Sequence, residues 1–268
     1  MHSPPSLVFG YIYSYMSIQP SMSPPPDITA DIAVNLARIR EQIAAACRRA
    51  GRAQSEVALM AVSKMHPAAA VIEAYAAGLR LFGENRVQEF AEKSVGLAGL
   101  EEAKFHLIGP LQSNKATRAA ELFDAIDSVD SLKIATRLNA AAAALGKKLP
   151  ILLEVKLSHE ESKHGVDPAE LAALLAALAP LESLTAVGLM TVPPWPADLA
   201  NAGEEARPYF QELRRLRDAA LAVHPTLTQL SIGMSNDFAV AIEEGSTCIR
   251  VGTALFGKRT YPAASDAA

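Results

Sequence analysis

LPILLEV at residues 149–155 and TAVGLMTV at residues 185–192 are two apolar runs, separated by a helical pattern over residues 168–178. A run, a helix and a second run in this order are typical of two parallel strands joined by a helix that packs on the sheet. The same alternation, with short breaks of Gly, Pro, Asn and Ser, extends in both directions from Asp27 onward. The sequence therefore predicts a parallel sheet covered by helices.

Eight apolar runs predict eight strands, which begin near Val57, Leu79, Phe105, Phe123, Leu149, Thr185, Thr228 and Thr247. Seven helical segments lie between them, at residues 68–77, 86–93, 115–122, 132–145, 168–178, 204–223 and 237–244. An amphipathic segment, residues 32–49, precedes the first strand and supplies an extra N-terminal helix. The count favours a single (β/α)8 TIM-type barrel over an open doubly wound sheet, and no GxGxxG motif follows the first strand.

Residues 27–260 show no break in composition, so we expect one α/β barrel domain there. Residues 1–26 contain six of the 17 prolines and no Asp, Glu, Lys or Arg. Polar residues interrupt their apolar stretches, which argues against a signal peptide. We expect a flexible Pro-rich tail, or translation that begins at Met16 or Met22, and a short C-terminal tail over residues 261–268.

The composition excludes several classes of protein. Half of the 268 residues are hydrophobic, which is typical of a globular protein, and the net charge of −4 offers no basic surface for nucleic acid or an anionic membrane. No apolar stretch approaches the roughly 18 residues of a membrane helix. Cys47 and Cys248 are far apart and belong to no Cys/His cluster, which argues against a disulfide scaffold or structural zinc. We therefore expect a cytoplasmic protein.

Chemistry in a barrel is placed at the carboxyl ends of the strands. Lys64 directly follows the first apolar run. Burial at this position would lower the pKa of its amine and make it a nucleophile, and the natural reaction of such a lysine is Schiff-base formation. The alternative is an ordinary rim lysine paired with Glu84 or another carboxylate.

The loops after the seventh and eighth strands predict an anion site. SIGMSND at residues 231–237 contains a glycine turn at Gly233, followed by Met234 and by Ser235 or Asn236 as the expected N-cap of the next helix. Gly252 and Thr253 follow the eighth strand. These two loops are the usual phosphate site of the fold. Simple capping of the helix is the alternative.

Three further polar side chains are candidates for the same mouth. Arg250, in the eighth strand, is a permanent cation that could donate to a pyridine nitrogen and keep it unprotonated, or could serve as an anion ligand or ion-pair partner. Asn85 follows the second strand and His106 lies within the third, and both could contact a bound ring. A buried strand histidine is more often a hydrogen-bonded core residue.

Several motifs together resemble one protein family. They are AVSK (61–64), FGEN with VQE (82–89), HLIGPLQSNK (106–115), ESKHG (161–165), GLMTVP (188–193), LSIGMSND (230–237) and GSTCIRVGTALFG (245–257). In this order they resemble the pyridoxal phosphate homeostasis protein family. MHP at 65–67, VKLS at 155–158 and the Pro-rich tail depart from the family pattern.

The resemblance implies a barrel like the N-terminal domain of alanine racemase that binds pyridoxal 5'-phosphate (PLP). Lys64 would form the internal aldimine, and Arg250 would face the pyridine nitrogen. Asn85 matches a residue near the ring. The family positions around the phosphate correspond to Met234, Ser235, Gly252 and Thr253.

The resemblance further implies a carrier and regulator of the intracellular PLP pool, without established turnover. The chain ends at Ala268, soon after the eighth strand, so we expect no racemase-type second domain and a monomer with an open cofactor face. PLP-dependent apo-enzymes would be its partners, and neither nucleic acid nor a membrane is expected. The alternatives are a Schiff-base enzyme, either a weak PLP-dependent amino-acid racemase or a barrel aldolase, and a purely structural barrel.

Overall fold

The computed structural model describes residues 28–158, 160 and 164–257. Its eight strands are β1 (Ala58–Val62), β2 (Leu81–Glu84), β3 (Lys104–Leu107), β4 (Ala125–Val129), β5 (Leu149–Glu154), β6 (Leu184–Met190), β7 (Gln229–Ser231) and β8 (Cys248–Val251). They form a closed barrel in chain order, in which all neighbouring strands are parallel and β8 pairs with β1. Each predicted apolar run therefore holds one strand of the predicted (β/α)8 barrel.

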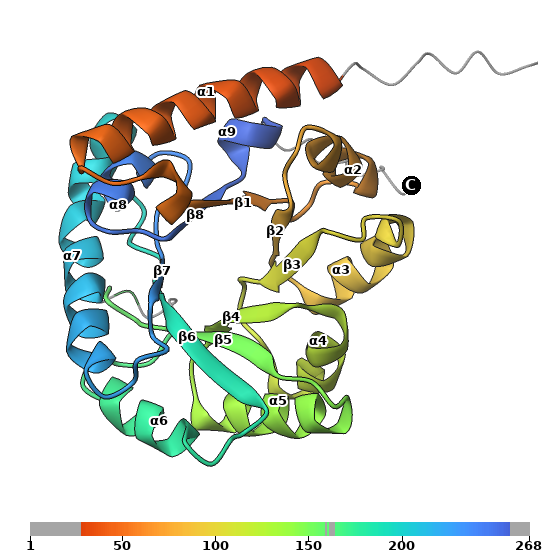
Figure 1. Ribbon diagram of the computed structural model, residues 1–268, viewed down its shortest axis with the longest axis vertical. Coiled ribbons are helices and arrows are strands. Elements are labelled where there is room, and N and C mark those ends of the chain that lie inside the picture. The colour runs from red at the N-terminus through yellow and green to blue at the C-terminus, as the bar shows by residue number, and fades with distance from the viewer. Residues whose placement is uncertain (1–27, 159, 161–163, 258–268) are drawn as a thin grey trace, which may run out of the picture.

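Helices surround the strands (Figure 1). They are α1 (Ile28–Arg49), α2 (Ala68–Ala76), α3 (Val87–Ser94), α4 (Ala116–Leu122), α5 (Leu132–Ala144), α6 (Leu171–Leu178), α7 (Ala202–Leu221), α8 (Phe238–Glu243) and α9 (Thr253–Phe256). Short 3-10 turns occupy Gln54–Glu56, Val95–Leu97, Ser113–Lys115 and Leu199–Asn201. Among the described residues, no helix has the length and apolar character needed to cross a membrane.

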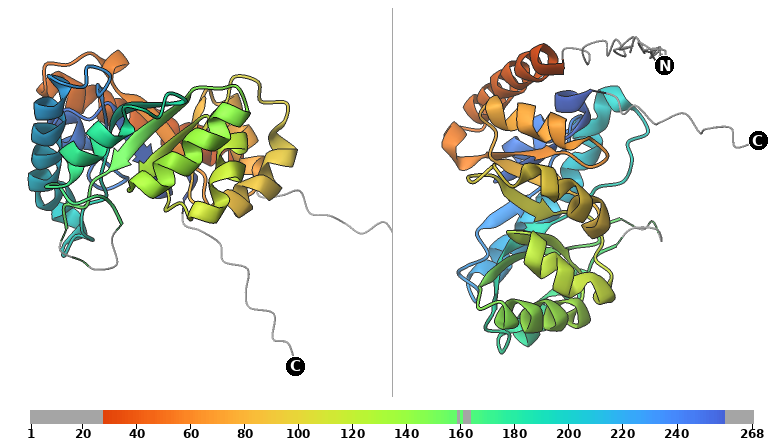
Figure 2. Two further views of the ribbon diagram at one scale, coloured as in Figure 1. Left: turned by 90° about the horizontal axis from the view of Figure 1, so that it is seen from below. Right: turned by 90° about the vertical axis from the view of Figure 1, so that its right-hand side faces the viewer.

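The two ends of the described chain meet on one side of the barrel. Helix α1 packs against α8 and α9, and Figures 1 and 2 show the red N-terminal helix beside the blue C-terminal elements. The amide of Asn35 in α1 donates to the carbonyl of Leu255 in α9 at 3.0 Å. The predicted N-terminal helix thus covers the place where the barrel closes.

Two positions differ from the sequence prediction. The N-cap of α8 is Asp237, not Ser235 or Asn236, so the predicted cap was wrong by one or two residues. Helix α9 was not predicted, because a four-residue helix is too short to show a helical period. The predicted tails, residues 1–26 and 261–268, lie outside the described residues, as does most of the ESKHG motif.

Side chains of the strands divide between two buried regions, because successive residues of a strand face opposite sides. Ala61, Phe82 and Val251 belong to the hydrophobic core shared with the helices. Their neighbours Met60 and Arg250 are register partners on the opposite, inner side of the barrel wall. The inner side also carries buried charged groups, which sets the chemistry of the barrel interior apart from the apolar outer core.

Candidate functional site at the carboxyl ends of the strands

Lys64 lies half-buried in the turn that follows β1. Glu84, the partner considered for it, is engaged elsewhere: its Oε1 accepts hydrogen bonds from Lys93 Nζ and Ser63 Oγ, each at 2.7 Å. Its Oε2 is buried and has no hydrogen-bond partner. Glu84 is thus the ion-pair partner of Lys93, and pairing of Lys64 with another carboxylate stays an alternative.

The loop after β7 is shaped by a glycine with positive φ. Gly233 has φ +97°, and a Cβ there would be 2.6 Å from the Cβ of Ala241. The next residue, Met234, donates its N–H to the buried carboxylate of Asp237. Burial raises the pKa of Asp237, against the opposing effects of this hydrogen bond and of Arg250. The hydrogen bond between Met234 and Asp237 thus fixes the shape of the loop.

The loops after β7 and β8 meet. Ser235 Oγ accepts a hydrogen bond from the backbone N–H of Ala254 in α9 at 3.3 Å. Gly252 lies so near β1 that a Cβ would be 3.3 Å from the carbonyl oxygen of Val62. Since Val62 is two residues before Lys64, the strand-eight loop, with Gly252 and Thr253, lies against the end of β1. The structure therefore brings the predicted phosphate residues and the end of the lysine strand to one side of the barrel.

Arg250 is buried below this mouth, with 4% of its surface exposed. Its two terminal nitrogens donate to Thr191 O at 2.9 Å, to Ser231 Oγ at 2.9 Å and to Ser231 O. Burial lowers its pKa, and nearby acidic groups, including Asp127, oppose the shift. Its Nε–H and one N–H of its second terminal nitrogen make no hydrogen bond within the described residues, so two donors of the ionised guanidinium remain for a ligand.

Asn85 follows β2 and is half-buried. It lies in close contact with Gly109, where a Cβ would be 2.3 Å from the backbone oxygen of Asn85 and 2.8 Å from its Oδ1. Only a glycine at position 109 leaves room for the Asn85 side chain in its observed place. The strand-three loop therefore supports Asn85 at the carboxyl ends of the strands.

His106 does not join this group. Its side chain borders a cavity of about 320 Å³ together with residues at the amino ends of strands, among them Lys104, Pro150 and Gln229. Its Nδ1 lies 3.0 Å from Asp127 Oδ1. Burial acts to lower the pKa of His106, but the attraction of Asp127 outweighs it, so the pKa lies above its ordinary value of 6.5. His106 is the third of the four residues of β3, so its place in the strand did not predict this contact with β4.

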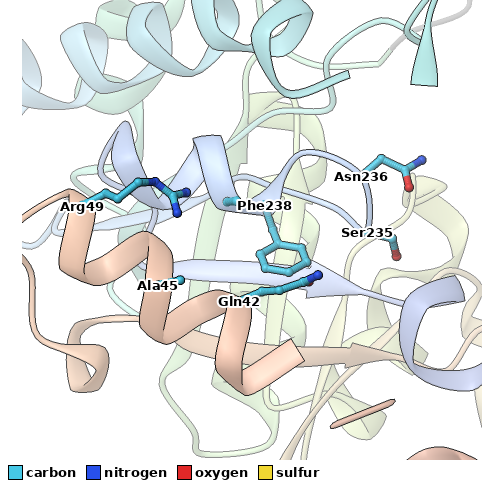
Figure 3. Close-up of a pocket in the computed structure, with 7 residues that line it drawn as sticks. Gln42, Ala45, Arg49, Ser235, Asn236 and Phe238 are labelled. Carbon is cyan, nitrogen blue, oxygen red and sulfur yellow. The ribbon is translucent and has the colours of Figure 1, made fainter. Parts of the chain in front are cut away.

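Another cavity, of about 280 Å³, lies outside the barrel mouth (Figure 3). Gln42 and Arg49 of α1 line one side of it, and Ser235, Asn236 and Phe238 line the other. Neither Lys64 nor Arg250 borders it. Within the described part of the chain, no group of three or more His, Cys, Asp or Glu residues is placed to hold a metal ion.

Sequence reasoning missed several partners in the site. Ser231 and Thr191 accept hydrogen bonds from Arg250, and both lie at strand ends that the apolar runs marked. Their contact with Arg250 could not be predicted, because the Arg250 side chain reaches from β8 past β7 to the end of β6. Lys93 carries no such signal, because it lies on a helix. Its contact with Glu84 arises only when α3 packs on the barrel.

Comparison with known proteins shows to which family this chain belongs. The family model "Alanine racemase, N-terminal domain" matches residues 34–260. The pyridoxal phosphate homeostasis protein of Escherichia coli K12 is 44% identical over 236 residues, which are 86% of this chain and 98% of that protein. This chain belongs to the pyridoxal phosphate homeostasis protein family. The member from Pseudomonas aeruginosa is 46% identical over 232 residues, 87% of this chain and 97% of its own length.

Solved structures agree with this membership in the pyridoxal phosphate homeostasis protein family. PipY of Synechococcus elongatus PCC7942 is 44% identical, and its structure without PLP matches with a TM-score of 0.76 over 84% of this chain and 100% of PipY. Its structure with PLP bound matches with a TM-score of 0.75 over the same shares. Alanine racemase of Clostridium difficile 630 is 16% identical and matches over 58% of its length with a TM-score of 0.64, which supports the fold alone.

Proposed function

We propose that this protein binds PLP reversibly at the carboxyl mouth of the barrel, through Lys64, and carries the cofactor within the cell's PLP pool without turnover of its own. The observation that carries the proposal is the approach of Gly252 to the carbonyl of Val62, which joins the strand-eight loop to the end of the lysine strand. The proposed phosphate loops and the amine of Lys64 would therefore be close enough to bind the same small molecule. PLP carries an aldehyde and a phosphate arm on neighbouring carbons of one ring, so a single molecule can present both groups.

The phosphate would be held by the loops after β7 and β8. Backbone N–H groups in turns and at helix starts bind phosphate oxygens, and glycine permits close backbone approach. Gly233 and Met234 shape the first loop, and Ser235 connects it with the second through Ala254. Gly252 and Thr253 would contribute from the second loop.

The pyridine ring would lie above Arg250. Two donors of Arg250 are not used on Ser231 and Thr191, and one of them, its Nε–H, would fit an unprotonated ring nitrogen. When bound, PLP supplies an aldehyde and an electron-withdrawing ring, and a ring kept unprotonated is a weaker electron sink. This pairing favours storage over catalysis. Asn85 would contact the ring from the end of β2, whereas His106, at the other end of the barrel, is left out of the proposed site.

Lys64 would supply the covalent attachment. Its Nζ adds to the aldehyde carbon, one water leaves, and a Schiff base forms; addition of water or of another amine reverses the step. Reversibility is what a carrier needs, because an acceptor apo-enzyme must be able to take the cofactor. The resemblance of the whole barrel to PipY, for which a PLP-bound structure exists, supports this assignment.

The test is an absorbance titration of the purified protein with PLP, followed by borohydride reduction and mass mapping of the labelled lysine. We expect a visible Schiff-base band and a label on Lys64. Lys64→Ala should lose both. The matched control is Lys156→Ala, because Lys156 also follows a strand, β5, and is half-buried there. No band and no label on Lys64 with excess PLP would overturn the proposal.

Carrying and catalysis are separated by two further measurements on the loaded protein. A carrier should restore the activity of a PLP-dependent apo-enzyme faster when PLP is supplied on the wild type than when the same amount is trapped by borohydride reduction. A racemase would instead exchange the α-proton of alanine in deuterated solvent. Catalysed exchange that disappears in Lys64→Ala would refute the absence of turnover.

A further inference from the structure

Helix α3 contacts the backbone on both sides of Lys64. Lys93 Nζ donates to the carbonyl oxygen of Ser63 at 2.9 Å, one residue before Lys64. Glu89 Oε1, one helical turn earlier in α3, accepts the backbone N–H of Met65, one residue after it. Two side chains of one helix thus hold the peptide groups that flank the lysine.

The held segment is strained. Met65 has φ +62° and is the one non-glycine residue with positive φ in the described part of the chain. A side chain in the left-handed region costs roughly 1–2 kcal/mol, and such residues persist where the surroundings hold them. Strand β1 fixes one end of the turn and α2 fixes the other. Relaxation of Met65 would therefore be absorbed within residues 63–67, which include Lys64 next to Met65.

The hold depends on a buried charge. The side chain of Lys93 is 7% exposed, and that of Glu84, its partner at 2.7 Å, is 0% exposed. Ser63 Oγ donates to the same Glu84 oxygen, so the residue before Lys64 is bound through both its carbonyl and its hydroxyl. The other oxygen of Glu84 has no hydrogen bond, and a buried carboxylate left half-paired is costly for stability.

We propose that Lys93 is a positioning residue for Lys64: with Glu84 and Glu89 it holds Ser63 and the strained Met65, and so keeps the Lys64 amine directed into the barrel mouth. Lys93 itself does not touch the cofactor. This proposal rests on the proposed function, because it gives Lys93 a part in the reaction of Lys64 with aldehydes. The contacts on which it is based are those of the protein without a ligand.

The test compares the reactivity of two lysines within each protein. The apo protein is treated with formaldehyde and cyanoborohydride, and methylation of Lys64 is followed by mass spectrometry relative to Lys156 in the same molecule. We expect Lys93→Met to change this ratio by more than about twofold, because a Lys64 amine that is no longer held in place would differ in burial and therefore in pKa and reactivity. Lys93→Arg, which keeps the charge and the donors, should restore the ratio most of the way.

Two further variants separate positioning from folding. Glu89→Ala removes the acceptor of Met65 and a 3.4 Å ion pair with Lys93, leaves the buried pair of Lys93 and Glu84 in place, and provides the test should Lys93→Met fail to fold. Arg207→Met is the matched control: it breaks ion pairs with Glu204, Glu243 and Glu244 on the outer helices and should leave the Lys64 ratio unchanged.

The outcomes decide between the possible roles. If Lys93→Met and Glu89→Ala lower the melting temperature but leave the Lys64 ratio within about twofold of wild type, a spread of roughly 0.4 kcal/mol, the network is only structural and the proposal is refuted. The PLP titration is run on the same proteins. A wild type that forms no band with PLP would overturn the proposed function, while a changed methylation ratio in Lys93→Met would still support the positioning role.

Discussion

Single residues decide where the mouth of this barrel can hold a ligand. A Cβ at Gly233 would be 2.6 Å from the Cβ of Ala241, and one at Gly252 would be 3.3 Å from the oxygen of Val62, so both loops pack closely against their neighbours. Gly233 also needs the left-handed region, which glycine enters without steric cost. At both positions the absence of a Cβ, rather than a functional group, is what the proposed site requires.

Gly233→Ala should destabilise the protein by about 2–4 kcal/mol and weaken PLP binding. Its new Cβ adds the cost of a left-handed alanine to an overlap with Ala241. Gly51→Ala is the control, because Gly51 has φ +64° but nothing within 4 Å of a Cβ, so only about 1 kcal/mol is expected. Urea unfolding of both variants measures the difference. Equal losses would show that the close approach at Gly233 does not matter.

Elements hold the barrel closed and tie its two ends together. Helix α1 lies against α8 and α9 and buries one face, with Ile32, Leu36 and Ile39 all at most 2% exposed. Beyond the helix, Arg52 donates to the carbonyls of Ile242 and Ser246, at 2.9 and 2.8 Å. The N-terminal helix is therefore part of the barrel wall rather than an appendage.

Two substitutions on α1 test this role. Leu36→Ala leaves a cavity in the core and should cost about 2–5 kcal/mol. Val34→Ala, on the same helix but 58% exposed, should change stability by no more than about 0.5 kcal/mol. Thermal and urea unfolding give both values. A small loss for Leu36→Ala would mean that the barrel folds without the helix.

The pair of His106 and Asp127 links β3 to β4 inside the barrel and should make stability depend on pH. Because the folded-state pKa of His106 lies above its ordinary value of 6.5, the pair stabilises the fold below that value. The stabilisation is lost as the pH rises through the folded-state pKa. Wild type should therefore lose more stability than Asp127→Asn between mildly acidic and alkaline pH.

Urea unfolding of the two proteins at a series of pH values measures this difference, in which most other titrating groups cancel. The ring resonances of His106 give its pKa directly. Parallel stability curves, or a His106 pKa at or below 6.5, would contradict the expected role of Asp127.

At the scale of the whole molecule, the closed sheet makes the barrel one cooperative unit. Every strand pairs with two neighbours, and β8 returns to β1. The proposed PLP site draws on both of these strands and on β7, so a ligand there joins the first and last parts of the sheet. Binding at the mouth should therefore stabilise the entire fold against unfolding.

PLP at 100 times its dissociation constant should stabilise the folded protein by about 2.7 kcal/mol. A single unfolding transition should move upward as a whole, because the ligand contacts strands that close the barrel. Differential scanning calorimetry with and without PLP measures the shift. Lys64→Ala should show a smaller shift at the same concentration, and an equal shift would place the ligand elsewhere.

Much of the architecture could be read from the sequence. Apolar runs and helical periods are local signals, so they marked all eight strands, the helices from α1 to α8 and the strand ends where Lys64, Asn85, Arg250 and Gly252 lie. The family resemblance rests on the same local motifs. The N-cap of α8 was misplaced because Ser, Asn and Asp in succession are all good caps, and packing chose Asp237.

Other features were decided by the tertiary structure alone. Whether a strand residue serves the carboxyl or the amino mouth depends on its height in a staggered barrel, and this places His106 beside Asp127, away from the proposed ligand site. The hydrogen bond from Lys93 to the carbonyl of Ser63 depends on how α3 packs against β1 and β2. The sequence by itself determined which groups exist and which strand ends carry them. Their distances and burial follow from long-range packing, which no local pattern encodes.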